Sequence, residues 1–281
     1  MTDSPSALGI DIGGTSVKVV ALRGDALLWS ARRRYRMPGR TELTLAVQSA
    51  INGREGRFNS VGLCVPGLLD EQKERVELSV NVPGLVGVPL AEMIAQAVGG
   101  APARLRITND SIASGYDIYA SRKLTGRLLV LALGTGVGAA VLDEGVPLTV
   151  DNESPGHIGQ FDVSVEGAPL IGPDGGAGSL EGYIGAEALR QNYGADPASK
   201  LQPDHPPIKA LARAVRICHA IYRPHHVVLA GGLGIRLGHL LPELKLLIET
   251  HLTSIARPGW TLAAGDSDFH AARGAARMAE K

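Results

Sequence analysis

The chain has 281 residues, of which 44% are apolar, and its 28 basic and 28 acidic side chains give a formal net charge of zero. This length accommodates one large domain or two ordinary ones, and the balanced charge gives no electrostatic reason to expect nucleic acid or an anionic membrane as a partner. With only two cysteines, Cys64 and Cys218, a disulfide framework is excluded and a reducing cytoplasm is expected.

The first residues lack the basic and apolar regions of a signal peptide, and no stretch approaches the ~18–20 unbroken apolar residues of a membrane helix. We therefore expect a cytoplasmic protein that does not span a membrane.

The first half of the chain alternates short apolar runs with helical patterns. Residues 7–35 predict three strands, separated by turns at Gly13-Gly14 and Gly24-Asp25. Further along, the pattern predicts a helix over 41–53 and, over 61–70, a buried strand that runs into a Pro-Gly turn. It then predicts a helix over 88–100 and a strand that ends at Asn109-Asp110 before another helix.

The second half begins with a segment whose layout is similar to the opening one. Residues 126–148 again predict a strand, a glycine turn, a strand and a polar glycine turn, which indicates an internal duplication. A loop-rich region covers 149–178. The remainder predicts helices near 180–193 and 207–222, a strand running into a glycine turn over 225–234, and helices over 239–252 and 269–280. Strands alternating with helices predict an α/β fold.

Three glycine turns are candidates for binding phosphate: "DIGGTSVK" (11–18), "LGTGVG" (133–138) and "AGGLG" (230–234). Glycine lets backbone N–H groups converge on an anion with no Cβ in the way. Hydroxyls from Thr15 and Thr135 and the charge of Lys18 would add donors. Three such sites suit a nucleotide, although each alone is compatible with an ordinary hairpin turn.

These turns do not match the common nucleotide fingerprints. We expect them to join strand to strand, unlike the Rossmann turn, and no GxxxxGK[ST] P-loop is present. Asp11 lies at the end of an apolar strand, where an unpaired charge is costly. A Mg²⁺ ion carried by nucleotide phosphates is a suitable partner for it, and capping of the following turn is the alternative.

The order of these segments resembles the ROK family, which belongs to the actin-like ATPase superfamily. "GIDIGGTSVKVVAL" and "LALGTGVGAAVL" resemble its two phosphate motifs and "VVLAGGLG" its adenosine motif, while "VPGLLD", "NVPGLVGVPL" and "TNDS" follow in family order. The resemblance implies an α/β, two-lobed actin-like ATPase (ribonuclease H-like) fold, with mixed sheets flanked by helices and a ligand cleft between the lobes. We expect one lobe over 1–112 with a helix at about 266–281, and the other over 113–265.

The resemblance also implies ATP-dependent phosphorylation of a sugar hydroxyl with Mg²⁺, and commonly a homodimer. Asp110 matches the catalytic base of the family. It lies at the end of a strand, where its carboxylate can accept the proton of a sugar hydroxyl while the neighbouring Asn109 holds the sugar in position. Asn81 is a further sugar contact by the same resemblance, and capping is the alternative role for Asn109-Asp110. The implied nucleotide-binding residues are Asp11, Gly13, Gly14, Thr15, Lys18, Gly134, Thr135, Gly136, Gly231 and Gly232.

One segment departs from the family pattern. Family members carry Gly-Glu-x-Gly-His after the second phosphate motif, and three cysteines that complete a zinc site with that His. Here His157 stands at the Glu position and Gln160 at the His position, and 171–185 contains no Cys. In the alternative register His157 is the family His and Ser154 takes the Glu position. Since Gln is a poor zinc ligand and thiolates are missing, we predict no structural zinc.

The departure bears on the substrate. A carboxylate only accepts hydrogen bonds, whereas the imidazole that replaces it can donate or accept. We therefore expect that the substrate is not plain glucose bound in the usual way of the family. It would be another hexose, a modified sugar or a more acidic compound. Glu181 in "SLEGYIG" resembles a retained sugar contact. The alternative is that His157 and Gln160 have no ligand role. Without zinc we expect the 165–185 loop to be reshaped, unless packing of Leu170, Ile171, Leu180 and Tyr183 replaces the metal.

Other functions stay open at this point. A non-catalytic sugar- or nucleotide-binding regulator is the main alternative, because the family includes transcriptional repressors. Those carry an N-terminal DNA-binding module, whereas ten residues precede Asp11 here, so a DNA-binding role is not expected. A different enzyme on the same fold, or polyphosphate in place of ATP as the donor, is also compatible with these residues.

Overall fold

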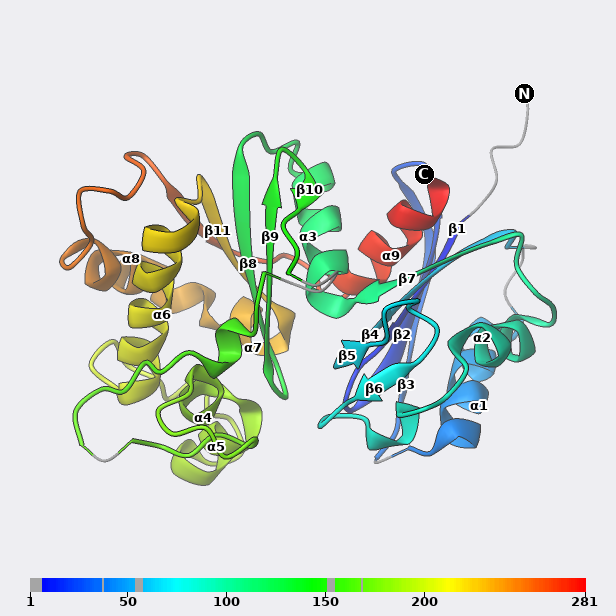
Figure 1. Ribbon diagram of the computed structural model, residues 1–281, viewed down its shortest axis with the longest axis horizontal. Helices are drawn as coiled ribbons and strands as arrows, with labels where there is room; N and C mark the ends of the chain where they lie inside the picture. Colours follow the sequence, from blue (N-terminus) through cyan, green and yellow to red (C-terminus); the bar gives the residue numbers. More distant parts are fainter. Residues whose placement is uncertain (1–6, 37, 54–57, 151–154, 168) are drawn as a thin grey trace. The chain divides into compact units, whose positions relative to one another are not determined.

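The computed structural model describes residues 7–36, 38–53, 58–150, 155–167 and 169–281 (Figure 1). The described residues divide into two compact units. The first contains residues up to Lys123 together with Phe269–Lys281, and the second contains Leu124–Val150 and residues 155–268. Among the helices of this described part, none combines the length and the apolar character that a membrane crossing requires.

The first unit is built on a five-stranded mixed sheet with the order β3-β2-β1-β4-β7. β1 (Ala7–Ile12), β2 (Ser16–Arg23) and β3 (Ala26–Arg34) form an antiparallel meander. β4 (Ser60–Val65) and β7 (Arg104–Asn109) run parallel to β1. The other elements are α1 (Arg40–Ile51), α2 (Leu90–Val98), α3 (Asp110–Ser121), α9 (His270–Glu280), the short strands β5 (Leu68–Leu69) and β6 (Val76–Leu78), and the 3-10 helix η1 (Pro83–Leu85).

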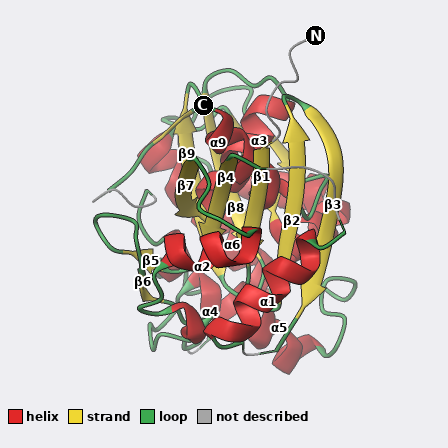
Figure 2. Cartoon of the chain, turned by 90° about the vertical axis from the view of Figure 1, so that its right-hand side faces the viewer, coloured by secondary structure: helices red, strands yellow, loops and turns green. Residues whose placement is uncertain are grey.

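Side chains that alternate along β1 separate the two faces of this sheet. Leu8 and Ile10 point to the face that packs against apolar side chains of α1 and α2. Figure 2 shows α1 lying across this sheet. Ala7 faces α9 together with Val20 of β2. Because α9 is rich in alanine and glycine, its backbone comes very close to the sheet. A Cβ atom built on Gly9 would lie 1.8 Å from the carbonyl oxygen of Ala272.

A buried polar network joins α9 to α3. Asp117 of α3 has no exposed surface, and its Oδ2 lies 2.7 Å from Nδ1 of His270. Its Oδ1 accepts a hydrogen bond of 2.9 Å from Nε of Arg277, which also reaches Asp25 in the β2–β3 turn. A buried carboxylate is tolerated only when its oxygens have partners. Asp117 therefore fixes the position of α9 against α3.

The second unit repeats the architecture with the strand order β10-β9-β8-β11-β12. β8 (Arg127–Leu133), β9 (Val137–Asp143) and β10 (Val146–Pro147) are antiparallel, and β11 (His226–Ala230) and β12 (Thr261–Ala264) run parallel to β8. The remaining elements are α4 (Leu180–Ile184), α5 (Ala186–Tyr193), α6 (Pro206–Tyr222), α7 (Gly231–Arg236) and α8 (Leu241–Glu249), with the 3-10 helices η2 (Ile158–Gln160) and η3 (Leu237–Leu240). Its apolar core gathers side chains from the sheet and from α4 and α6.

The two sheets share one strand order and the same strand directions, as the predicted duplication requires. Two expectations differ from the structure. The boundary expected after residue 112 falls inside α3, which belongs to the first unit because it packs on α9. The third glycine turn does not join strand to strand: β11 ends at Ala230, and Gly231 begins α7.

Candidate active site

A row of polar side chains crosses the first sheet near the carboxyl ends of its parallel strands. In the register of the strands, Asp11 of β1 lies opposite Lys18 on one side and Cys64 on the other. The row continues through Arg32 of β3 and Thr108 of β7. Since parallel strands end at the same edge of a sheet, the row brings Asp11 close to the start of α3.

Asp11 is almost fully buried, with 4% of its surface exposed, and it has a positive neighbour. Nζ of Lys18 lies 3.3 Å from its Oδ2. The thiol of Cys64 lies 3.7 Å from Oδ1, and burial, followed by the charge of Asp11, raises the pKa of Cys64 well above its usual value. Lys18 therefore compensates part of the Asp11 charge, while Cys64 stays a neutral thiol.

The first glycine turn connects β1 to β2 and is held by Tyr35. The N–H of Gly13 donates to the carbonyl of Ser16 at 3.0 Å. The N–H of Tyr35 donates to the carbonyl of Thr15 at 3.1 Å, and its hydroxyl donates to the carbonyl of Gly13 at 2.5 Å. Burial raises the pKa of Tyr35, which keeps this hydroxyl protonated. The turn is thus preorganised, with Thr15 exposed at its tip.

Asp110 is the first residue of α3 and lies half-buried at the same edge. The side chain of Asn109 caps the helix by accepting a 2.7 Å hydrogen bond from the N–H of Ile112, so the capping role is confirmed for Asn109. Oδ1 of Asp110 accepts a 3.1 Å bond from the hydroxyl of Ser111. Burial, and then the charge of Asp11, raise the pKa of Asp110 to about 6. A carboxyl that titrates near neutral pH suits a general base.

Asn81, the other sugar contact predicted in this unit, lies half-buried between β6 and η1. The hydroxyl of Ser79 accepts a 3.2 Å bond from the N–H of Val82 and shapes the turn that carries it. Within the described residues, no hydrogen bond joins Asn81 to Asn109 or Asp110, so its part in the site stays a prediction.

In the second unit, hydrogen bonds to α5 and to Glu181 of α4 hold the glycine turn between β8 and β9. The N–H of Ala186, at the start of α5, donates to the carbonyl of Gly134 at 3.1 Å. Oε2 of Glu181 accepts a 2.8 Å hydrogen bond from the N–H of Val137. Burial, and then the charge of Asp174, raise the pKa of Glu181. Supporting this turn is a role for Glu181 that the sequence did not reveal, and its sugar contact stays a prediction.

The third glycine segment adjoins the second. Gly231 has a φ of +76°, and a Cβ there would lie 2.4 Å from the carbonyl oxygen of Leu133, the last residue of β8. Glycine is required at this position by both its conformation and its close approach to β8. Gly134 and Gly232 differ, because a Cβ on either would meet no atom within 4 Å. The structure therefore places two predicted nucleotide segments side by side, with open space over Gly134 and Gly232.

The segment that departs from the family pattern forms a loop around η2. His157 and Gln160 are both exposed, and the His157 ring has no hydrogen-bond partner among the described residues. Nε2 of Gln160 donates to Oδ2 of Asp174 at 3.1 Å. A carboxylate only accepts hydrogen bonds, so Asp174 fixes which end of the amide faces it. The Gln160 carbonyl oxygen, which lies near Gly176, accepts no hydrogen bond from a described residue.

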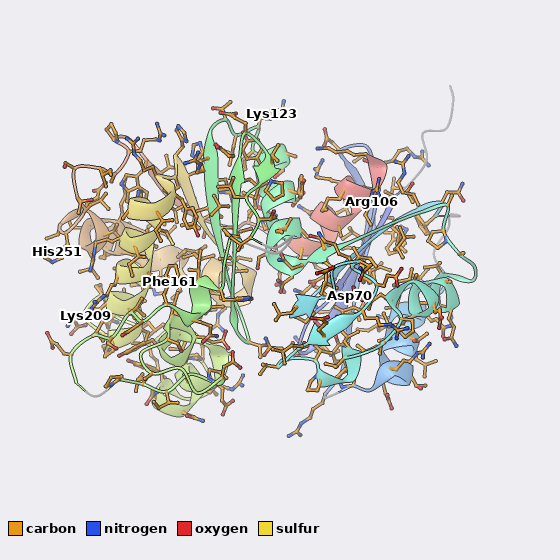
Figure 3. All side chains as sticks on the ribbon, viewed as in Figure 1. Asp70, Arg106, Lys123, Phe161, Lys209 and His251 are labelled. Atoms are coloured by element: carbon orange, nitrogen blue, oxygen red, sulfur yellow. The ribbon has the colours of Figure 1, made fainter. Side chains whose placement is uncertain are left out.

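Backbone hydrogen bonds hold this loop together. The N–H of Val163 donates to the carbonyl of Gly178 at 2.8 Å. The carbonyl of Phe161, a residue labelled in Figure 3, accepts from the N–H of Leu180 at 3.1 Å. Leu180 and Tyr183 are buried as expected, whereas Leu170 and Ile171 are exposed, so only half of the expected apolar packing exists. Within the described residues no three His, Cys, Asp or Glu side chains are grouped as metal ligands; the absence of zinc stays a prediction.

The sequence matches the ROK family over residues 7–281. It is 27% identical to an N-acetyl-D-glucosamine kinase of Vibrio cholerae, over 95% of this chain and 97% of that protein. A ROK family glucokinase from Streptomyces griseus, solved with glucose and AMPPNP, superposes with a TM-score of 0.77 at 18% identity, over 98% of this chain and 99% of that one. A ROK hexokinase from Thermus thermophilus gives a TM-score of 0.73 at 22% identity, over 98% and 97%. These likenesses confirm the predicted fold.

Proposed function

The chain belongs to the ROK family and is a sugar kinase, and on that premise we propose that it transfers a phosphoryl group from ATP to a hydroxyl of an N-acetylated hexosamine, with Asp110 as the general base. The observation that carries the proposal is the position of Asp110. It lies beside the charge of Asp11 at the edge of the sheet that carries the first glycine turn, and its pKa is raised to about 6.

The chemistry assigns a distinct task to each residue. Asp110 accepts the proton of the acceptor hydroxyl as that oxygen attacks the terminal phosphorus of the donor, and the bond between that phosphorus and the bridging oxygen breaks. Asn109 holds Asp110 in place by capping α3. Backbone N–H groups of the glycine turns and the ammonium of Lys18 balance the negative charge of the phosphates.

The residues present fit the nucleotide and its metal. Gly134 and Gly232 leave open the space that a Cβ would fill, as a phosphate or ribose approaching the backbone requires. Asp11 would hold Mg²⁺ through the nucleotide phosphates, since a near-buried carboxylate beside a phosphate turn is a suitable hard-oxygen group. When bound, the cation supplies charge neutralisation on the transferred phosphoryl group.

Two observations support an N-acetylated hexosamine as the acceptor. The kinase of Vibrio cholerae named above acts on N-acetyl-D-glucosamine, and the carbonyl of the exposed Gln160 can accept a hydrogen bond from an amide N–H. The charge of the loop argues against the more acidic substrate considered from the sequence. Residues 155–189 contain five carboxylates and no Lys or Arg, and among the described residues Asp174 and Glu181 have no cationic partner.

We expect N-acetyl-D-glucosamine to have the highest kcat/KM in a panel with glucose and glucuronate, followed by an assay of ADP release. Glucuronate should be at least about 100-fold worse, because its carboxylate would face Asp174 and Glu181 without a counter-charge. Efficient phosphorylation of glucuronate would contradict the assignment of the loop.

The variant Asp174→Asn tests the orientation of Gln160. Asparagine can donate to the Gln160 carbonyl, which removes the preference for one end of the amide. We expect KM for N-acetyl-D-glucosamine to rise about 5- to 10-fold, in line with one hydrogen bond, while KM for ATP stays unchanged. An equal rise of both constants would indicate a general disturbance of the loop.

The variant Gly134→Ala tests whether the phosphates of the donor bind close to the backbone of the second glycine turn. The added methyl group enters open space, so the free energy of unfolding should change by less than about 0.5 kcal/mol. KM for ATP should rise about 10-fold or more, because the methyl occupies the place of the phosphates. Gly238→Ala in η3, whose Cβ would make an ordinary 3.8 Å contact with Ala264, is the control. Unchanged ATP binding in Gly134→Ala would place the nucleotide elsewhere.

A further inference from the structure

Tyr35 binds the first glycine turn through both its side chain and its backbone, and the proposed catalysis gives this residue no task. Its hydroxyl donates to the carbonyl of Gly13 at 2.5 Å, and its N–H donates to the carbonyl of Thr15 at 3.1 Å. Both carbonyls belong to the turn that is predicted to bind phosphate, whereas Tyr35 follows the end of β3. A residue outside the turn therefore orients two of its peptide units.

The orientation of a carbonyl also fixes the N–H group of the next residue. In a trans peptide, the C=O and the N–H of one unit point in opposite directions. The bond to the Gly13 carbonyl therefore directs the N–H of Gly14 away from the Tyr35 hydroxyl. Among the described residues, this N–H has no backbone or side-chain acceptor. It is available to an anion that approaches the turn from the side opposite Tyr35.

The second glycine turn is held in a similar way. The N–H of Ala186 lies outside that hairpin, and it donates to the carbonyl of Gly134 at 3.1 Å and to that of Thr135 at 3.3 Å. In both turns, a residue from elsewhere in the chain thus binds two carbonyls. A carbonyl oxygen repels a phosphate, whereas an N–H group attracts it. Among these donors, the Tyr35 hydroxyl belongs to a side chain, so a substitution can remove it.

The hydroxyl of Tyr35 is not explained by packing. The ring packs against the apolar core on the α1 side of the sheet, and phenylalanine would fill that space equally well. Burial, and then the charge of Asp11, raise the pKa of Tyr35, so the hydroxyl keeps its proton and acts as a donor near neutral pH. Its hydrogen bond goes to the glycine turn.

We propose that Tyr35 is a positioning residue of the phosphoryl transfer: its hydroxyl keeps the Gly13 carbonyl away from the terminal phosphate of the donor and directs the N–H of Gly14 toward that phosphate. This inference rests on the proposed function. The terminal phosphate is the one concerned, because β1, which leads into the turn, and β7, which leads to Asp110, both run parallel to β4 and end at the same edge of the sheet. An N–H group that is already oriented needs no rearrangement when charge moves during the transfer.

Calorimetric titration with AMPPNP, ADP and adenosine tests this role, because the three ligands differ in their phosphates. The protein is used as wild type, as Tyr35→Phe and as Tyr222→Phe. Tyr222 is the matched control, since its hydroxyl donates to the carbonyl of Pro155 at 2.7 Å in the second unit. We expect Tyr35→Phe to bind AMPPNP about 10-fold more weakly than wild type, in line with one hydrogen bond to a charged group. The loss should be smaller for ADP and within about twofold for adenosine, and Tyr222→Phe should stay within about twofold for all three ligands.

Two further readouts do not depend on the stability of the variant. In steady-state kinetics, Tyr35→Phe should raise KM for ATP about 10-fold and leave KM for the sugar unchanged, a split that a general loss of structure would not produce. In the wild-type protein, the amide resonance of Gly14 should shift on addition of AMPPNP, and shift less with ADP. A Gly14 resonance that responds equally to AMPPNP and adenosine would contradict its contact with the terminal phosphate.

The inference and the proposed function fail in different ways. Equal affinity of wild type and Tyr35→Phe for AMPPNP overturns the inference, as does an equal loss for AMPPNP and adenosine or an equal loss in Tyr222→Phe. If the wild type then phosphorylates N-acetyl-D-glucosamine with MgATP, the proposed function stands without the inference. Binding of AMPPNP that depends on Tyr35, with no phosphorylation of that sugar, supports the role of Tyr35 at the turn and refutes the proposed acceptor.

Discussion

Asp110→Asn is expected to lower kcat by about 10³-fold, the usual range for loss of a general base, and to stabilise the protein at the same time. Asparagine keeps the shape of the side chain but cannot accept the proton of the acceptor hydroxyl. The gain in stability follows from the raised pKa of Asp110, about 6 instead of 3.8, which burial and then Asp11 produce. Ionised Asp110 therefore costs free energy in the folded state, and asparagine removes that cost.

The sign of the stability change depends on pH. Between pH 4 and 6 the folded protein holds a proton on Asp110 that the unfolded chain has lost, so the wild type loses stability as pH rises through this interval. One pKa unit corresponds to about 1.4 kcal/mol, and screening of a half-exposed carboxylate reduces the gain to about 1–2 kcal/mol. Urea denaturation should show Asp110→Asn as the more stable protein at pH 8 and as equal to wild type at pH 4.

The same titration predicts the pH profile of the reaction. Because the base must be ionised, kcat/KM should fall tenfold per pH unit below about pH 6, where Asp110 becomes protonated. A profile that stays flat to pH 5, or an Asp110→Asn variant that retains activity, would assign the proton transfer to another group.

Gly274→Ala is expected to have the largest effect on stability, a loss of about 3 kcal/mol or more. The new Cβ would lie 1.7 Å from the carbonyl oxygen of Ala113 in α3, so backbone would have to move on one side or the other. In an exposed helix, replacing glycine by alanine raises the free energy of unfolding by about 0.5–1 kcal/mol. At Gly274 we expect the opposite sign, because the added Cβ has no space. Denaturant unfolding of Gly274→Ala measures this loss. Gly238→Ala is again the control, and a Gly274→Ala protein as stable as wild type would refute the packing of α9 on α3.

Local patterns in the sequence were enough for much of the fold. Alternating apolar residues and glycine turns predicted both hairpins, and the Asn109-Asp110 pair predicted the strand end and the helix start. The third glycine segment was predicted wrongly, as a turn between strands. Its glycines begin α7, because Gly231 approaches β8 closely, and no local pattern shows that approach.

The site was less accessible to sequence reasoning, because its properties arise from residues far apart in the chain. Asp11 influences the pKa of Asp110 only because β4 brings β1 and β7 to the same edge of the sheet. The bond between Gln160 and Asp174 depends on the path of a glycine-rich loop, for which apolar periodicity gives no signal. The sequence offers a weak indication of it, a carboxylate in the stretch where the family has cysteines.

The place of α9 in the chain has a consequence for biosynthesis. The first unit consists of residues made early, yet the helix that covers one face of its sheet is the last described element of the chain. The second unit is formed by later residues, Leu124–Val150 and 155–268. During synthesis on the ribosome, one face of the N-terminal sheet therefore stays uncovered until α9 has been made. The second unit can fold before that, since domains fold as units when their chain emerges. Nascent chains that lack 270–280 should accordingly be the species that chaperones bind.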